Sequence, residues 1–102
     1  MMLRAPIRCR FVFAFRNEDP ETGKPVHLQL AFDCRLRVRP VPGDIFPVAA
    51  MDPLGMSFTG YKKTLAELRQ YAEIYEVTRV EFGKYRGRDI LFIYFRIPTL
   101  QA

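Results

Sequence analysis

Residues 26–39 alternate between apolar and polar side chains, with Ala31 among the polar positions, and this pattern restricts the fold more than any other feature of the chain. A period of two predicts a β-strand with one face in the core and one face toward solvent. Arg35, Arg37 and Arg39 occupy successive polar positions, so they are expected to point away from the core. The apolar positions are Val26, Leu28, Leu30, Phe32, Cys34, Leu36 and Val38.

A second run with the same period, residues 8–16, precedes this strand. Cys9, Phe11, Phe13 and Phe15 fall on one side of it, and Arg8, Arg10, Val12, Ala14 and Arg16 fall on the other. The intervening loop NEDPETGKP has the composition of a turn, so the two runs are predicted to form an antiparallel hairpin. Fourteen extended residues would span roughly 45 Å at about 3.3 Å each. A compact domain of this length has a radius of gyration of only about 13 Å, so the hairpin must coil, carry a bulge or project.

Residues 40–60 are rich in Pro and Gly yet contain many apolar side chains. We expect a short edge strand near residues 44–50, because Pro47 is tolerated only at an edge or a bulge. Packing of this segment against the core is favoured over binding to a partner, because a small domain needs most of its apolar side chains for burial.

The remaining chain predicts one helix followed by a second hairpin. Apolar residues spaced by three and four predict a helix from Tyr61 to Tyr75, with Thr59 as a cap or with Thr64 and Glu67 forming a capping box. Strands are predicted at 77–82 and 90–95, joined by a turn at Gly87. Residues 90–95 read ILFIYF, which predicts burial on both faces, with the second face covered by the 40–60 segment or by a second subunit.

These elements predict the α+β class: an antiparallel sheet of four to five strands, in the order β-β-(β)-α-β-β, packed against one helix. The 102 residues are interpreted as a single domain, 1–102.

The charge of the chain points toward an anionic partner. Lys and Arg together number 16 against 11 Asp and Glu, and twelve of the 16 are Arg, whose planar fork grips phosphate or carboxylate in two places. A cross-strand ion pair from Asp33 to Arg8 or Arg10 is also expected. Because the phenylalanines of the first hairpin face the other side, contact with nucleic acid would be mainly to phosphate. The predicted anion-binding residues are Arg8, Arg10, Arg35, Arg37 and Arg39.

No motif supports catalysis, a metal site or a cofactor. The segment GMSFTGYKKT lacks the glycine–lysine–threonine order of a phosphate-binding loop, and RGRDILF lacks the aromatic positions of an RNA-recognition strand. His27 is a lone histidine, and no two carboxylates can be assigned acid and base roles from their spacing. Cys9 and Cys34 are expected to be buried, reduced packing residues of a cytoplasmic protein, and a structural disulfide between them is the alternative. No apolar run reaches the length of a signal peptide or a membrane span.

The function predicted from sequence is a non-catalytic interaction module whose Arg-bearing hairpin face binds nucleic acid or an acidic protein surface. One alternative is an assembly or regulatory subunit, including a homodimer, that uses the 40–60 segment and the 90–95 strand. Another is a small-molecule binder with a pocket between helix and sheet near Tyr61, Tyr71 or Tyr75. The residues predicted for a protein interface are Phe46, Met51, Met56, Phe58, Phe92 and Tyr94.

Overall fold

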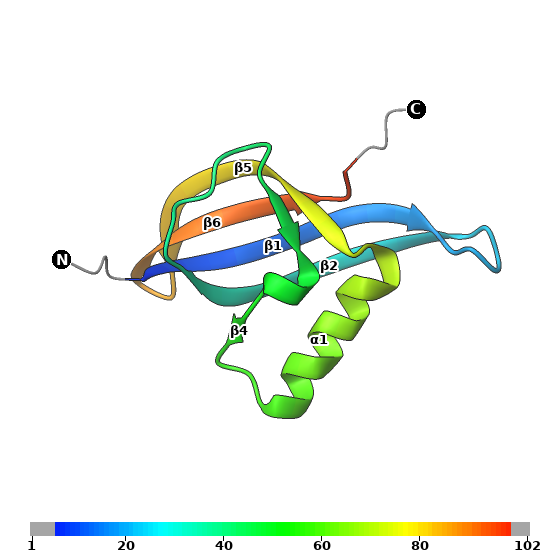
Figure 1. Ribbon diagram of the computed structural model, residues 1–102, viewed down its shortest axis with the longest axis horizontal. Helices are drawn as coiled ribbons and strands as arrows, with labels where there is room; N and C mark the ends of the chain where they lie inside the picture. The colour runs from blue at the N-terminus through cyan, green and yellow to red at the C-terminus, as the bar shows by residue number, and fades with distance from the viewer. Residues whose placement is uncertain (1–5, 99–102) are drawn as a thin grey trace.

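Residues 6–98 fold as one curled sheet with a single α-helix packed on it (Figure 1). The computed structural model describes residues 6–98; residues 1–5 and 99–102, which belong to the predicted domain, lie outside the described residues. The strands are β1 (Ile7–Glu18), β2 (Pro25–Leu36), β3 (Ile45–Pro47), β4 (Pro53–Leu54), β5 (Ile74–Tyr85) and β6 (Arg88–Arg96). A 3-10 turn, η1 (Val48–Ala50), follows β3, and the helix α1 spans Phe58–Tyr71.

The α+β class with one helix is therefore confirmed, while the strand count was too low. The described chain has six strands in the order β3-β5-β6-β1-β2-β4. The additional strands are short: the expected edge strand is present as β3, and β4 forms the opposite edge beside β2. Neighbouring strands are antiparallel with one exception, since β1 and β6 run parallel.

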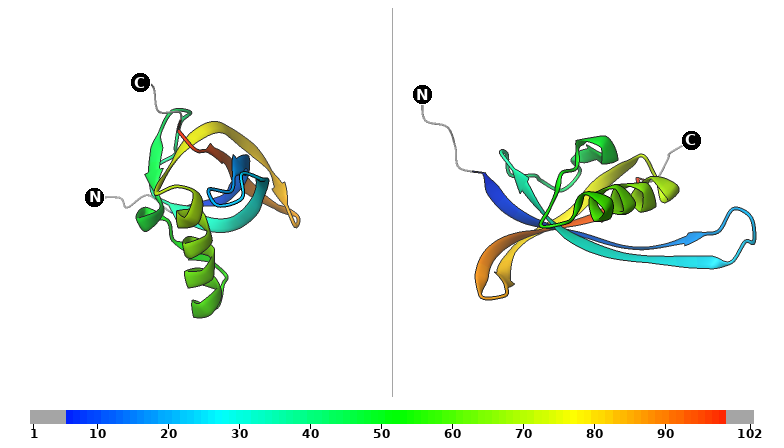
Figure 2. Two further views of the ribbon diagram at one scale, coloured as in Figure 1. Left: turned by 90° about the vertical axis from the view of Figure 1, so that its right-hand side faces the viewer. Right: turned by 90° about the horizontal axis from the view of Figure 1, so that it is seen from below.

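The two edges of the sheet come close together because the chain between them is short. Residues 48–52 separate β3 from β4, and five extended residues span at most about 18 Å. The sheet must therefore curl, as Figure 2 shows in its left-hand view along the molecule. Val48 and Met51 of this connection are buried, so the connection also fills the space between the edges.

The long β1–β2 hairpin both coils and projects. It pairs without a bulge from Ile7↔Leu36 to Glu18↔Pro25, and the irregularity in the sheet lies in β5, between Val77 and Arg79. The described residues measure 51 × 34 × 26 Å, and the β1–β2 turn extends past α1 (Figure 1).

Strand β2 ends at Leu36, three residues earlier than the alternation predicts. Its partner β1 begins at Ile7, and the residue before it is Pro6, which has no amide hydrogen to continue the ladder. Arg37 and Arg39 consequently lie in a bend beyond the strand.

Interlocked aromatic rings fill the concave inner face of the sheet. The rings of Phe13 and Phe95 stack with centroids 4.8 Å apart, and Phe11 meets Phe95 edge-on at the same distance. From outside the sheet, α1 contributes Leu65 and Leu68, and the 40–60 segment contributes Val48 and Met51. The predicted packing of the 40–60 segment is thus confirmed, but it lies on the same face as the helix. The prediction that this segment covers the second face of residues 90–95 was wrong.

The helix begins and ends earlier than its apolar stripe predicts. Ser57 is the N-cap, with its hydroxyl accepting from the Gly60 amide at 3.1 Å, so the predicted caps at Thr59 and Thr64 were wrong. Thr64 is instead a buried residue inside the helix. Tyr75 lies on β5, where its hydroxyl donates to the Leu68 carbonyl at 2.7 Å and ties the strand to the helix.

Ser57→Ala should lower the free energy of unfolding by about 1 kcal/mol, because the Gly60 amide loses its side-chain acceptor. Denaturant unfolding measures this loss. The matched control, Thr59→Ala, changes an exposed helix residue and should stay within about 0.5 kcal/mol of the unmodified chain. An equal or larger loss in the control would contradict the assignment of the cap.

Candidate functional site

The outer face of the sheet, opposite the helix, carries a large share of the arginines. The register that places Phe11 and Phe13 inside places Arg8 and Arg10 outside. In the right-hand view of Figure 2, α1 and η1 both lie on the other side of the sheet, so no described helix or strand packs over this face. The outer face comprises Arg8, Arg10, Val12, Ala14, Arg16, Glu18, Pro25, His27, Gln29, Ala31, Asp33, Arg35, Glu76, Arg79, Glu81, Gly83, Tyr85, Arg88, Ile90, Phe92, Tyr94 and Arg96.

A single carboxylate on this face pairs with two arginines. Asp33 accepts from Arg8 Nη2 at 3.1 Å and from Arg10 Nη1 at 2.9 Å, which confirms the predicted cross-strand ion pair with both candidates. The side chain of Asp33 is only 18 % exposed, so solvent screens these pairs less than surface pairs. Two guanidinium groups against one carboxylate leave one positive charge in excess.

A third arginine increases this excess. Arg35 lies directly opposite Arg8 across the hairpin, and like charges in that position repel one another. Asp33 relieves part of the repulsion through Arg8, but Arg35 forms no ion pair with any residue from 6 to 98. A hollow of about 220 Å³ lies here, lined by Arg8, Asp33, Arg35, Leu54 and Gly55.

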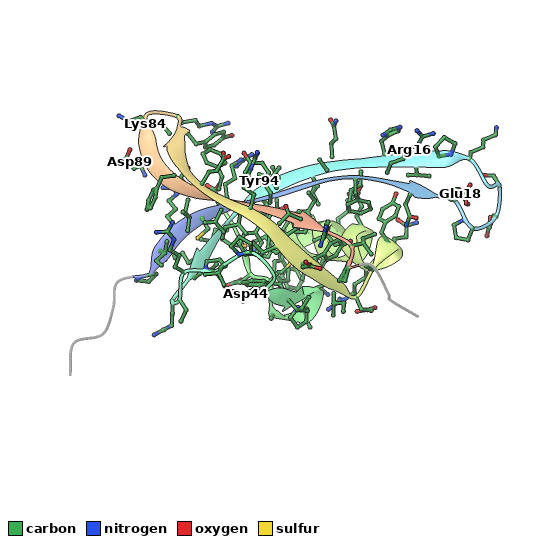
Figure 3. The ribbon with its side chains drawn as sticks, turned by 90° about the horizontal axis from the view of Figure 1, so that it is seen from above. Arg16, Glu18, Asp44, Lys84, Asp89 and Tyr94 are labelled. Atoms are coloured by element: carbon green, nitrogen blue, oxygen red, sulfur yellow. The ribbon has the colours of Figure 1, made fainter. Side chains whose placement is uncertain are left out.

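Aromatic rings share the outer face with the arginines, contrary to the sequence prediction. Arg10 lies over the ring of Tyr85, 4.1 Å from its centroid, and Arg79 lies over the ring of Tyr94 at 4.2 Å. The phenylalanines of β1 and β2 do face inward, as predicted. The outer rings come from β5 and β6, which the β1–β6 pairing places beside the arginines of β1. Figure 3 shows Tyr94 on the side of the sheet away from α1, with Asp44 on the opposite side.

The ring of Phe92 packs against the neighbouring strand, β5. A Cβ added at Gly83 would lie 2.8 Å from Cε2 of Phe92, so the ring lies against the glycine backbone. Cross-strand packing of an aromatic ring over a glycine supplies the apolar contact that the glycine itself lacks. Phe92 is therefore held on the sheet, which leaves Tyr94 as the next ring along β6.

Tyr94 borders a shallow trough across the middle of the outer face. One hollow of about 370 Å³ is lined by Val12, Ala14, Thr78, Arg79, Tyr94 and Phe95. A second, of about 330 Å³, shares Val12 and Ala14 with the first and extends toward Ala31 and Gln29. The trough exists because the central outer positions of β1 and β2 carry short side chains.

The predicted anion-binding residues are only partly brought together. Arg8, Arg10 and Arg35 share the outer face at one end of the sheet. Arg37 lies beyond the end of β2. Arg39 lies over the ring of Phe82, 5.2 Å from its centroid, and Phe82 pairs with the inward-facing Leu91. Arg39 is therefore on the helix side of the sheet, because the chain turns away from the strand before reaching it.

The predicted interface residues lie in three separate places. Met51 is 3 % exposed and Phe46 packs against the core, so both serve the interior. Met56 and Phe58 lie at the start of α1, where Phe58 is exposed and Lys62 Nζ lies 4.6 Å from its ring centroid. Phe92 and Tyr94 lie on the outer face. The structure therefore does not bring these six residues together into one apolar surface.

The structure also bears on the pocket predicted near the tyrosines between helix and sheet. Tyr75 is fully buried, while Tyr71 lines a hollow of about 390 Å³ between the β1–β2 turn and the end of α1. That hollow is bordered by the acidic residues Glu18, Asp19 and Glu21. Among residues 6–98, no group of three or more His, Cys, Asp or Glu side chains is arranged to hold a metal ion.

The two cysteines face each other inside the sheet. Cys9 and Cys34 are directly paired across β1 and β2, and both are free and buried. Burial disfavours the charged thiolate, raising the pKa of Cys9 to about 11 and that of Cys34 to about 12. These thiols are therefore poor nucleophiles at neutral pH.

No helix within residues 6–98 has the length and apolar character needed to cross a bilayer. Comparisons with protein-family models, with curated proteins and with solved structures find no match for the chain. The function is accordingly inferred from the geometry of the chain itself.

Gly83→Ala should lower the free energy of unfolding by about 1–3 kcal/mol, because the new methyl group collides with the ring of Phe92. Thermal and denaturant unfolding measure the effect. In a Phe92→Ala background the same substitution should cost nothing, because the space is then vacant. If Gly83→Ala raised the free energy of unfolding of the otherwise unmodified chain, the packing of the Phe92 ring against Gly83 would be contradicted.

Stability should fall as the pH rises above the ordinary thiol pKa of 9.0, because the folded state holds its thiol protons to higher pH than the unfolded chain. The contribution of the thiols is complete below pH 9.0 and is lost as the pH rises toward their folded pKa values. At about pH 10 each thiol should account for about 1 kcal/mol of the loss. The double variant Cys9→Ala/Cys34→Ala should show a smaller loss between pH 8 and pH 10. An equal loss in both proteins would contradict burial of the thiols.

Proposed function

We propose that the chain is a non-catalytic binding module whose outer sheet face contacts the phosphate backbone of a nucleic acid. The observation that carries the proposal is the group of Arg8, Arg10 and Arg35 around a single carboxylate, Asp33, on a face that no other described element covers. A phosphate entering this group would gain charge-assisted hydrogen bonds and relieve the repulsion between Arg8 and Arg35.

The charge of the whole outer face supports an anionic partner. Its arginines are Arg8, Arg10, Arg16, Arg35, Arg79, Arg88 and Arg96, and its carboxylates are Glu18, Asp33, Glu76 and Glu81. Seven arginines against four carboxylates leave a net positive surface. Such a surface attracts a polyanion at low salt and loses it as salt is added.

Nucleic acid is favoured over an acidic protein surface because aromatic rings lie among the arginines. Arginine and aromatic side chains together are the groups that proteins use to bind both the backbone and the bases of nucleic acids. Every base of a nucleic acid offers a flat ring that can stack on a ring such as Tyr94, whereas an acidic protein surface is defined by its carboxylates. An assembly subunit is the alternative proposal, and it draws on the exposed Phe58 and Met56 at the start of α1.

Replacing arginines on the outer face should weaken binding and flatten its dependence on salt. Fluorescence anisotropy with a labelled 15-nucleotide DNA strand, at 50 and 200 mM salt, measures both quantities. For a single strand, each lost phosphate contact should reduce the slope of log K against log salt by about 0.7, so Arg8→Gln/Arg35→Gln should reduce it by about 1.4. Asp33→Asn should act in the opposite direction and tighten binding, because it releases Arg8 and Arg10.

The matched control is Arg69→Gln on α1, which removes one positive charge from the helix side, as the single variant Arg8→Gln does from the outer face, and it should change binding least. Circular dichroism melts verify that each variant is folded. Absence of binding by the unmodified chain at 50 mM salt would overturn the proposal, and so would an equal effect of Arg69→Gln. Equally tight binding to polyglutamate would favour the acidic protein surface instead. A dimer in light scattering that dissociates on Phe58→Ala would favour the assembly subunit.

A further inference from the structure

We infer that the nucleic acid is single-stranded and that one of its bases stacks against Tyr94 in the trough over Val12 and Ala14. This inference rests on the proposed function and specifies the form of the ligand. It starts from an unusual feature of β6, a strand in the middle of the sheet whose outward side chains include two aromatic rings without a covering element.

Of the three aromatic rings on the outer face, Tyr94 has space beside it. Phe92 lies against Gly83 on β5. Tyr85 already has two guanidinium groups over its ring, with Arg10 at 4.1 Å and Arg86 at 5.3 Å from its centroid. Tyr94 has Arg79 over its ring, but it also borders the hollow of about 370 Å³.

The lining of this hollow suits an unpaired base. Val12 and Ala14 form an apolar floor, while the ring of Tyr94 and the guanidinium group of Arg79 are flat groups on which bases stack. The Thr78 hydroxyl donates to the Tyr94 carbonyl at 3.2 Å, so its oxygen still has a lone pair to accept from the edge of a base. A base inside a duplex is stacked on both sides and cannot enter such a hollow.

The arginines lie at a suitable distance from this base site. Tyr94 pairs with Val12, and the next outward residue of β1 is Arg10, which is paired with Asp33. Outward positions on one strand are about 7 Å apart, so a strand with one base beside Tyr94 can bring a neighbouring phosphate to Arg10 and Arg8. Arg16 lies two outward positions beyond Val12 in the other direction, which extends the positive track along β1.

The decisive experiment compares three probes of equal length: a 12-nucleotide oligothymidine, an abasic 12-mer with the same phosphates, and a 12-base-pair duplex. Oligothymidine should bind most tightly. Tyr94→Ala should weaken its binding roughly 5- to 100-fold, which corresponds to the loss of one base–aromatic stack. The same variant should leave binding of the abasic strand and the salt slope unchanged, because no phosphate contact is lost.

Two variants control for loss of structure. Tyr94→Phe keeps the ring and should bind oligothymidine as the unmodified chain does. Phe58→Ala removes an exposed ring with a cation beside it on α1 and should have no effect. The chain has five Tyr and no Trp, so tyrosine fluorescence offers a second readout. Oligothymidine should quench this fluorescence in the unmodified chain, and less so in Tyr94→Phe.

The outcomes separate the two levels of the proposal. If the abasic strand or the duplex binds as tightly as oligothymidine, stacking on Tyr94 is wrong while phosphate binding stands. Full retention of oligothymidine binding by Tyr94→Ala would also overturn the stacking. If none of the three probes binds at 50 mM salt, the proposed function itself fails.

Discussion

The parallel pairing of β1 with β6 determines what the outer face contains. It joins the first strand, which carries Arg8 and Arg10 outward, to the last strand, which carries Phe92 and Tyr94 outward. The same pairing brings Phe11, Phe13 and Phe95 together inside, where their rings interlock. Burying these rings stabilises the arrangement that leaves the opposite face charged and aromatic, so one interaction produces both the core and the candidate site.

The short connection between the edge strands has a comparable effect on shape. Because residues 48–52 join β3 to β4, the sheet curls around its own aromatic side chains, and α1 closes the interior from one side. The helix and this connection both pack on the inner face of the sheet, so neither of them covers the outer face. On the outer side of β6, the neighbouring strand β5 supplies the contacts: Arg79 lies over Tyr94, and the backbone of Gly83 lies under Phe92.

The local parts of this structure follow from local sequence patterns. Alternation predicted the β1–β2 hairpin, its inner and outer sides and the Asp33 ion pairs, because side-chain direction in a strand depends only on position. It failed at Arg37 and Arg39, where the partner strand starts after Pro6 and the ladder stops. The helical stripe failed at Tyr75 for a similar reason: strand pairing of residues 74–85 with β6 overrides a helical spacing that happens to include a tyrosine.

Only part of the candidate site could be predicted from the sequence. The arginines are evident in the sequence, but the rings beside them depend on the strand order, which no periodicity within a strand reveals. A tyrosine in the run ILFIYF indicates burial as readily as exposure, and only the neighbours of β6 decide between them. Gly83 was the one local signal, since a glycine inside a strand often marks the close approach of another group.

Side-chain NMR of the 102-residue chain during titration with a 12-nucleotide DNA strand tests the central claim most directly, because it reports which surface meets the ligand. We predict that the arginine Nε–H signals of Arg8 and Arg35 and the ring signals of Tyr94 shift together and saturate at one ratio, while those of Phe58 and Arg69 on α1 stay unchanged. Shifts confined to α1, or arginine and tyrosine signals on the outer face that do not move, would contradict the assignment of this face as the binding surface.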